Sequence, residues 1–211
     1  LTYLIEDGKI APAKLVLVIS ALGREKGGEG IRSMTALEAL SLASALTAKN
    51  GTAVKAGDSV VISGENIDTG GGATGIGWDD EASAVSFTYP GLGGARQVWI
   101  ENAFSAGFQL DLAARYHLGG VAIDDVSTGA GASDIWPVVQ DFIDSGNVSL
   151  VKPNSTLFVP HWEADGGSLK GGDDGSVTWT APADAGTYAV TLVVSDGIAR
   201  VGQRLSLTVS P

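Results

Sequence analysis

Short apolar runs alternate with helical patterns over the first two thirds of the chain. Residues 15–19 form an uninterrupted apolar run of strand length, and residues 121–123 form a shorter one. A strand that is apolar on both faces is typical of a parallel sheet covered on both sides. Helical patterns over 36–49, 102–117 and 133–143 complete part of a repeating strand–helix order.

The predicted helices carry recognisable signals at their ends. Thr35 followed by Glu38 is an N-terminal capping pattern, and Asn50-Gly51 gives a stop for the first helix. In the second helix, Phe104, Phe108 and Leu112 recur at four-residue spacing, which predicts one packed ridge.

Residues 52–99 have a different character. Runs at 59–63, 84–89 and 96–100 are strand-like and are separated by glycine-rich turns. The pattern predicts an antiparallel insertion between the first apolar run and the second helix.

From residue 147 onward the hydrophobic period becomes two. Residues 176–180, 187–194 and 204–209 alternate between apolar and polar, as half-buried antiparallel strands do. Turn clusters separate these runs at short spacing, which favours a small β-sandwich. We place the boundary between the two parts at 146–152.

Composition narrows the classes of protein. The 211 residues are 44% apolar and include 30 glycines, so the chain can bury a core and has many turns. A net charge of −11 argues against binding to nucleic acid or anionic membranes, and no apolar run is long enough to span a membrane. The absence of cysteine excludes disulfides and thiolate sites. Because the first residue is leucine, we expect the sequence to begin inside a longer precursor or a cut chain.

Several segments in order resemble the C-terminal quarter of a glycoside hydrolase family 18 barrel, of the chitinase or spore cortex-lytic type. They are residues 9–20 (KIAPAKLVLVIS), 97–105 (QVWIENAFS), 118–123 (LGGVAI) and 134–137 (DIWP). These resemble strand seven, helix seven with strand eight, and the start of helix eight. The resemblance covers about residues 1–146, with a small α+β insertion domain at about 24–99.

The remainder resembles a bacterial immunoglobulin-like, PKD-like module. Residues 177–182 (VTWTAP), 185–188 (AGTY) and 194–197 (VSDG) carry this likeness. The predicted fold class is therefore α/β plus all-β: a partial TIM-barrel segment (1–146), followed by an immunoglobulin-like β-sandwich (147–211). The module implies an exported protein, secreted or at the cell surface.

The resemblance also implies a chemistry. Family members cleave β-1,4-linked N-acetylglucosamine polymers, with a catalytic glutamate at the end of a DxxDxDxE strand. That motif does not occur in this sequence. Leu22 stands where the family has a tyrosine, and Asp124 where it has a tryptophan that floors the sugar subsite. Both differences remove a sugar contact, so we assign no catalytic residue.

Four side chains are candidates for glycan contact. Asp124 and Asp125 follow the second apolar run, where they could meet a sugar or a metal, although adjacent strand residues point to opposite faces. Trp78 and Trp162 lie beside turn-rich sequence and could form exposed stacking platforms.

Other motifs favour structural roles. Residues 79–81 are an acidic cluster without calcium-loop spacing, which favours a solvated turn, as do Asp173-Asp174. Residues 70–75 fit GxGxxG, but no helix is expected after them, so a loop is favoured over a phosphate site. The histidines, His117 and His161, have no nucleophile motif beside them.

The remaining tryptophans are predicted to belong to the core. Trp99 and Trp136 match buried positions of the family, and Trp179 lies in an alternating strand.

Three functions stay open. The first is a non-catalytic exported or cell-surface protein that acts in assembly or glycan interaction. The second is the C-terminal part of an active hydrolase of chitin or peptidoglycan, and the third is a carbohydrate-binding protein without hydrolysis. No metal or cofactor is expected. Because two parallel strands cannot cover their own faces and edges, we expect an upstream segment, another chain, or a homo-oligomer or filament to complete the barrel.

Overall fold

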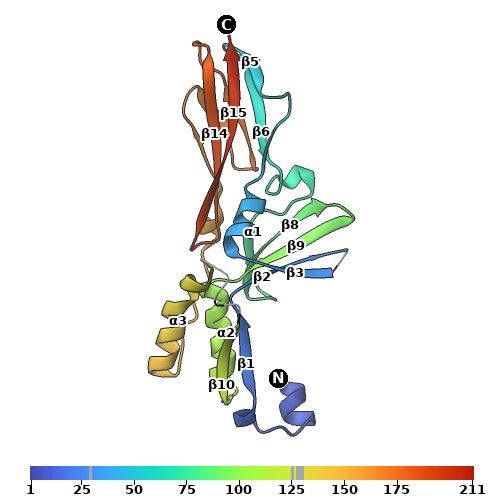
Figure 1. Cartoon of the computed structure of the whole chain (residues 1–211), viewed down its shortest axis with the longest axis vertical. Helices are drawn as coiled ribbons and strands as arrows, with labels where there is room; N and C mark the ends of the chain where they lie inside the picture. Colours follow the sequence, from blue (N-terminus) through green and yellow to red (C-terminus); the bar gives the residue numbers. More distant parts are fainter. Residues whose placement is uncertain (29, 125, 127–130) are drawn as a thin grey trace.

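The chain folds into an elongated, β-rich molecule with three α-helices and four β-sheets among the described residues (Figure 1). The computed structural model describes residues 1–28, 30–124, 126 and 131–211. The α-helices are α1 (Ala36–Ala43), α2 (Ala103–Arg115) and α3 (Gly131–Ser145). Short helices of other types are η1 (Tyr3–Asp7), η2 (Pro12–Lys14), η3 (Thr69–Gly71) and η4 (Ser155–Phe158). In the described part of the chain, no helix is both long enough and apolar enough to cross a bilayer.

A two-stranded parallel sheet lies near the N-terminal end. It pairs β1 (Val16–Ser20) with β10 (Gly120–Asp124), in the register Val16 opposite Gly120 and Ser20 opposite Asp124. Leu17, Ile19, Val121 and Ile123 pack with α2 and α3 on one face. The other face is open, because Val16 and Val18 are 58% and 62% exposed. Among the described residues, the predicted cover on both faces is therefore present on only one.

Helix α2 packs through a different ridge from the predicted one. Ala106, Leu110 and Ala113 are buried, whereas Phe104, Phe108 and Leu112 are only partly buried. The small residues allow close approach to the sheet and to α3, which is why they occupy the packed side.

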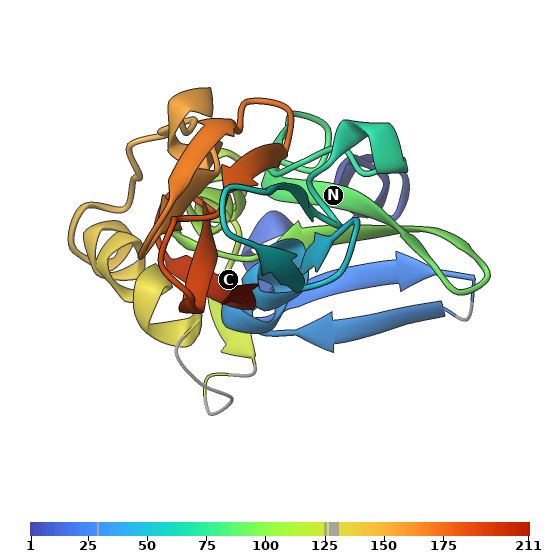
Figure 2. The same ribbon diagram turned by 90° about the horizontal axis from the view of Figure 1, so that it is seen from above.

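Five antiparallel strands form the insertion. Their order is β3 (Gly30–Met34), β2 (Gly23–Gly27), β9 (Gly94–Ile100), β8 (Ala84–Gly91) and β7 (Gly77–Asp79). One face packs with α1 around Phe87, Val98 and Leu40. Figure 2 shows the β2–β3 and β8–β9 hairpins extending to one side.

Helix α1 begins as predicted but ends early. The Thr35 hydroxyl accepts from Glu38 N at 3.2 Å, and the Glu38 carboxylate accepts from Thr35 N at 2.7 Å. The predicted continuation to Lys49 is wrong: the helix ends at Ala43, and Leu46–Ala48 form strand β4. Leu46 packs there between two hydrophobic clusters, and this tertiary packing outweighs its helix propensity.

Two four-stranded sheets face one another across a shared core at the C-terminal end. Trp179 is fully buried there and packs with Val60, Val190 and Leu207. One sheet has the order β11 (His161–Ala164), β14 (Gly186–Ser195), β15 (Arg200–Ser210), β5 (Ala53–Lys55). The other has the order β12 (Ser168–Gly171), β13 (Ser176–Thr180), β6 (Ser59–Gly64), β4 (Leu46–Ala48).

Three strands of these sheets come from the middle of the chain. β6 pairs antiparallel with β13, with Val60 opposite Trp179, and β5 pairs parallel with the end of β15. The sequence pattern places residues 59–63 in the antiparallel insertion, but the pairing places them beside the C-terminal strands. The alternation of apolar and polar residues does not determine which sheet a strand joins, because the pattern is the same for any partner strand.

A buried polar contact joins the C-terminal sheets to α2. Asn102 caps α2 by accepting from Phe104 N at 3.0 Å, and its Nδ2 donates to Asp196 Oδ2 at 3.2 Å. Both side chains are 0% exposed. Asp196 follows β14, and its other carboxylate oxygen accepts from Ile198 N and Ala199 N.

Candidate functional site

The carboxyl ends of β1 and β10 form a corner beside the five-stranded sheet. Ser20 lies opposite Asp124, and Ala21 N donates to the Asp124 carbonyl at 3.0 Å. Only Ala21 and Leu22 link β1 to β2. This short link holds the five-stranded sheet next to the edge where parallel α/β sheets usually place ligand sites.

Arg24 folds back over this edge. Its Nη1 donates to the Ser33 hydroxyl at 3.0 Å and to the carbonyl oxygens of Leu22 and Gly23 at 3.2 and 3.3 Å. The guanidinium is thereby fixed between the end of β1 and the β2–β3 hairpin, and it supplies a positive charge to the corner.

Glu101 lies between β9 and α2 and is mostly buried. The Ser105 hydroxyl donates to its Oε2 at 2.5 Å, and Gln109 Nε2 donates to its Oε1. Burial raises the pKa of Glu101, and the hydrogen bonds from Ser105 and Gln109 and the charge of Arg24 only partly offset this. The sequence pattern does not point to Arg24 or Glu101. The capping spacing of Asn102 and Ser105 is the signal that could have drawn attention to Glu101, which directly precedes the cap.

The four predicted glycan contacts come from different parts of the fold. Asp124 is exposed at the end of β10, in the corner, while Asp125 lies outside the described residues. Trp78 is on β7 in the five-stranded sheet, and Trp162 is on β11 in a four-stranded sheet.

Both tryptophans are packed against other side chains. The centroid of the Trp78 ring lies 5.4 Å from that of Phe108, and its Nε1 donates to Asp80 Oδ1 at 3.1 Å. Trp162 packs against two hydrophobic clusters, and in the described part of the chain its buried indole N–H has no hydrogen-bond partner. Each ring therefore has one side occupied by protein.

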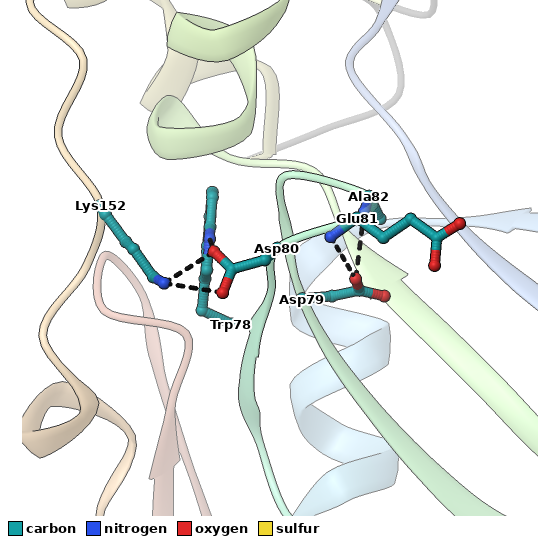
Figure 3. Close-up of polar contacts among 6 residues, drawn as sticks. All are labelled: Trp78, Asp79, Asp80, Glu81, Ala82 and Lys152. Atoms are coloured by element: carbon teal, nitrogen blue, oxygen red, sulfur yellow. Dashed lines mark hydrogen bonds and ion pairs between the residues drawn. The ribbon is translucent and has the colours of Figure 1, made fainter.

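The acidic cluster at 79–81 forms a turn and an ion pair (Figure 3). Asp79 Oδ1 accepts from the backbone N–H groups of Glu81 and Ala82, both at 3.0 Å. Asp80 pairs with Lys152 Nζ at 2.6 Å. Hydrogen bonds from Ala82 and Trp99 lower the pKa of Asp79 against a smaller effect of burial. The carboxylates of Asp79 and Asp80 are thus engaged by other groups of this chain.

The other motifs adopt the favoured structures. Residues 70–75 lead from η3 into β7 without a following α-helix, and Asp173-Asp174 form the turn between β12 and β13. Among the described residues, no group of three or more histidine, aspartate or glutamate side chains is arranged to hold a metal ion.

Two of the three predicted core tryptophans are only partly buried. Trp179 is fully buried, as predicted, but Trp99 is half-buried and Trp136 is 45% exposed. Trp136 is exposed because α3 packs against α2 through Ile135 and Val139, which point into the cluster with Ala106 and Leu110.

No protein-family model matches the chain, and no curated protein matches it. Among solved structures, it is similar to the spore cortex-lytic enzyme SleL of Bacillus megaterium, at 19% identity and TM-score 0.41, over 70% of this chain and 28% of that one. A chitinase from Chromobacterium violaceum has 20% identity and TM-score 0.41, over 64% and 35% of the two chains. The cell-surface-expressed chitinase ChiW from Paenibacillus has 13% identity and TM-score 0.36, over 100% and 29%. The chain spans about a third of the length of these structures.

Proposed function

We propose that this chain is a non-catalytic part of an exported or cell-surface protein. In this proposal residues 1–146 include a degenerate family 18-like barrel segment, and an immunoglobulin-like module follows that also takes in strands β4–β6. Both act in assembly or in glycan and surface interaction. The absence of DxxDxDxE from the sequence and the replacements at Leu22 and Asp124 support a role without hydrolysis.

The open two-stranded sheet is the observation that carries the proposal. Val16 and Val18 expose most of their surface on one face of β1, and the described residues add no third strand to the pair. An apolar parallel sheet gains stability when its open face and edges are covered. An upstream segment, another chain or a second copy would provide that cover.

The corner supports glycan interaction as the secondary role. Asp124 is exposed at the end of β10, opposite Ser20, and Arg24 Nη1 lies 3.5 Å from the Ser20 hydroxyl. A carboxylate, a hydroxyl and a guanidinium thus gather at one edge, and these groups match the hydroxyl and acetamido groups of a sugar. Trp78 and Trp162 remain proposed contacts, as does Asp125.

A turnover assay tests the non-catalytic assignment. We expect the purified chain to release no 4-methylumbelliferone from 4-methylumbelliferyl N,N′-diacetylchitobioside above the rate of the buffer alone. Turnover that survives repeated purification would overturn the assignment and support an active hydrolase instead. Binding of chitotetraose without turnover would support the carbohydrate-binding alternative.

Association of the chain tests the role of the open sheet. We expect concentration-dependent self-association at micromolar concentration, and the Val18→Lys variant to be shifted toward monomer in sedimentation velocity. Leu92→Lys is the matched control, since Leu92 is 93% exposed in the turn between β8 and β9, away from β1. A monodisperse wild-type monomer, or an equal effect of both variants, would contradict cover by a second copy and leave an upstream segment or another chain as the partner.

A further inference from the structure

A cavity of about 380 Å³ lies between the loop that follows β6 and the turn between β12 and β13. Its lining comes from residues 67–76 and 173–175, together with Phe158, Pro160 and Val194. None of these residues belongs to β1 or β10, so the inference drawn from the cavity does not depend on the open sheet.

The inner wall of the cavity is apolar and firmly packed. Ile67 and Phe158 are each 6% exposed and Val194 is 1% exposed. Gly175 approaches the backbone of Ile67 so closely that a Cβ atom there would lie 2.7 Å from the Ile67 carbonyl oxygen. The two loops therefore hold the wall in place by direct contact.

The rim of the cavity is acidic. Asp173 and Asp174 are exposed, and among the described residues no cationic side chain forms an ion pair with either. Ser176 donates to Asp174 Oδ1 from its hydroxyl at 3.0 Å and from its backbone N–H at 3.1 Å. These hydrogen bonds, with a smaller effect of the Lys49 charge, lower the pKa of Asp174, so its carboxylate is ionised at neutral pH.

We propose that this cavity binds a lysine or arginine side chain of a polypeptide. The alkyl stem would lie on the apolar lining, to which the partly exposed Ile76 and Pro160 contribute, and the cationic head would meet the carboxylates of the rim. Lysine and arginine side chains combine an apolar stem with a charged tip in this order. The charge of the rim repels phosphates and other anions.

A sugar fits the cavity less well. Sugars stack on exposed aromatic faces, and Phe158, the one aromatic residue of the lining among the described residues, is buried.

Nuclear magnetic resonance of the ¹⁵N-labelled full chain tests the proposal. The probes are acetyl-Gly-Lys-Gly-amide and the same peptide with an Nε-acetylated lysine. We expect the lysine peptide to cause saturable shifts of the Thr74, Gly75 and Gly175 amide signals. The acetylated peptide keeps the stem but loses the charge, so it should bind more weakly than the lysine peptide.

A pair of variants separates the effect of a charge on the cavity rim from the effect of the protein's net charge on peptide binding. Asp173→Asn should weaken binding about two- to fivefold, as expected for one exposed ion pair. Asp184→Asn, which removes an exposed charge outside the cavity lining, should leave binding unchanged. Equal binding of both peptides, equal effects of both variants, or no shift of these amides would overturn the proposal. Chitotetraose shifting the same signals would instead assign the cavity to a glycan.

Discussion

Two glutamates packed against their neighbours illustrate how those neighbours decide the protonation of a side chain. Burial alone would raise the pKa of Glu25, but hydrogen bonds from Arg32 and Tyr89 and the charges of Arg32 and Arg96 lower it overall. At Glu101 the same effect of burial outweighs its hydrogen bonds, and the pKa rises. The pKa values of two carboxyl groups of one residue type are thus shifted in opposite directions.

Removing the Glu25 carboxylate should destabilise the five-stranded sheet. Glu25 is 1% exposed, and Glu25→Ala would leave the Arg96 charge and the Tyr89 hydroxyl without this partner. We expect a loss of about 3 kcal/mol in the free energy of unfolding, measured in urea. Because the folded pKa is lowered, the Glu25 contribution is present above its ordinary value of 4.5 and is lost as the pH falls through the folded value. Glu25→Gln, with the same shape, should lose less; an equal loss would argue against the role of charge.

Neutralising Glu101 should stabilise the fold at neutral pH, whereas removing the Glu25 carboxylate should destabilise it. Because the folded pKa is raised, the stabilising contribution is present below the ordinary value of 4.5 and is lost as the pH rises through the folded value. We expect Glu101→Gln to raise the melting temperature at pH 8 relative to wild type, with little difference at pH 4. The exposed Glu81 provides the control variant Glu81→Gln, and a pH-independent difference at Glu101 would refute the prediction.

At the scale of elements, the N-terminal cap of a helix was the most readable feature. Thr35 and Glu38 start α1 as predicted, since a capping box depends only on residues three apart. The end of α1 was predicted wrongly because Leu46 and Ala48 are drawn into β4 by the side chains of other strands. Helix propensity is small beside such packing.

The two N-terminal caps should differ in their effect on stability. Thr35→Ala removes a partly exposed cap, which typically costs about 1 kcal/mol. Asn102→Ala removes a cap and also takes a hydrogen-bond donor from the buried Asp196 carboxylate, so we expect about 2–3 kcal/mol. Chemical denaturation of both variants compares the two values. Equal losses would mean that the Asn102–Asp196 contact contributes nothing beyond the cap.

At the scale of the whole molecule, the C-terminal sheets are built from two distant segments. Strands β4, β5 and β6 lie between residues 46 and 64, whereas β11–β15 lie between 161 and 210. Val60 of the first segment packs on Trp179 of the second in the shared core. The module predicted at 147–211 therefore shares its core with residues outside that range.

The fragment 147–211 should accordingly fail to fold alone. Without β5 and β6, the Trp179 ring and the unpaired edges of β13 and β15 would be exposed. We expect poor amide dispersion and a red-shifted tryptophan emission for the fragment, and native-like spectra for the full chain. A fragment with a cooperative thermal transition would show that the central strands are dispensable.

The sequence by itself determined most of the elements and little of their assembly. Alternation over 176–180 and 204–209, the apolar runs at 15–19 and 121–123, and the cap at Thr35 are local patterns, and each appears in the structure. Of the candidate site, only Asp124 was predicted in the corner; Arg24 and Glu101 were missed because their roles arise from neighbours on other elements. Tertiary structure alone decided that β6 joins β13, that Glu25 meets two arginines, and that one face of β1 stays open. Strand pairing and burial depend on residues far apart in the chain, and a local period is the same whichever partner is chosen.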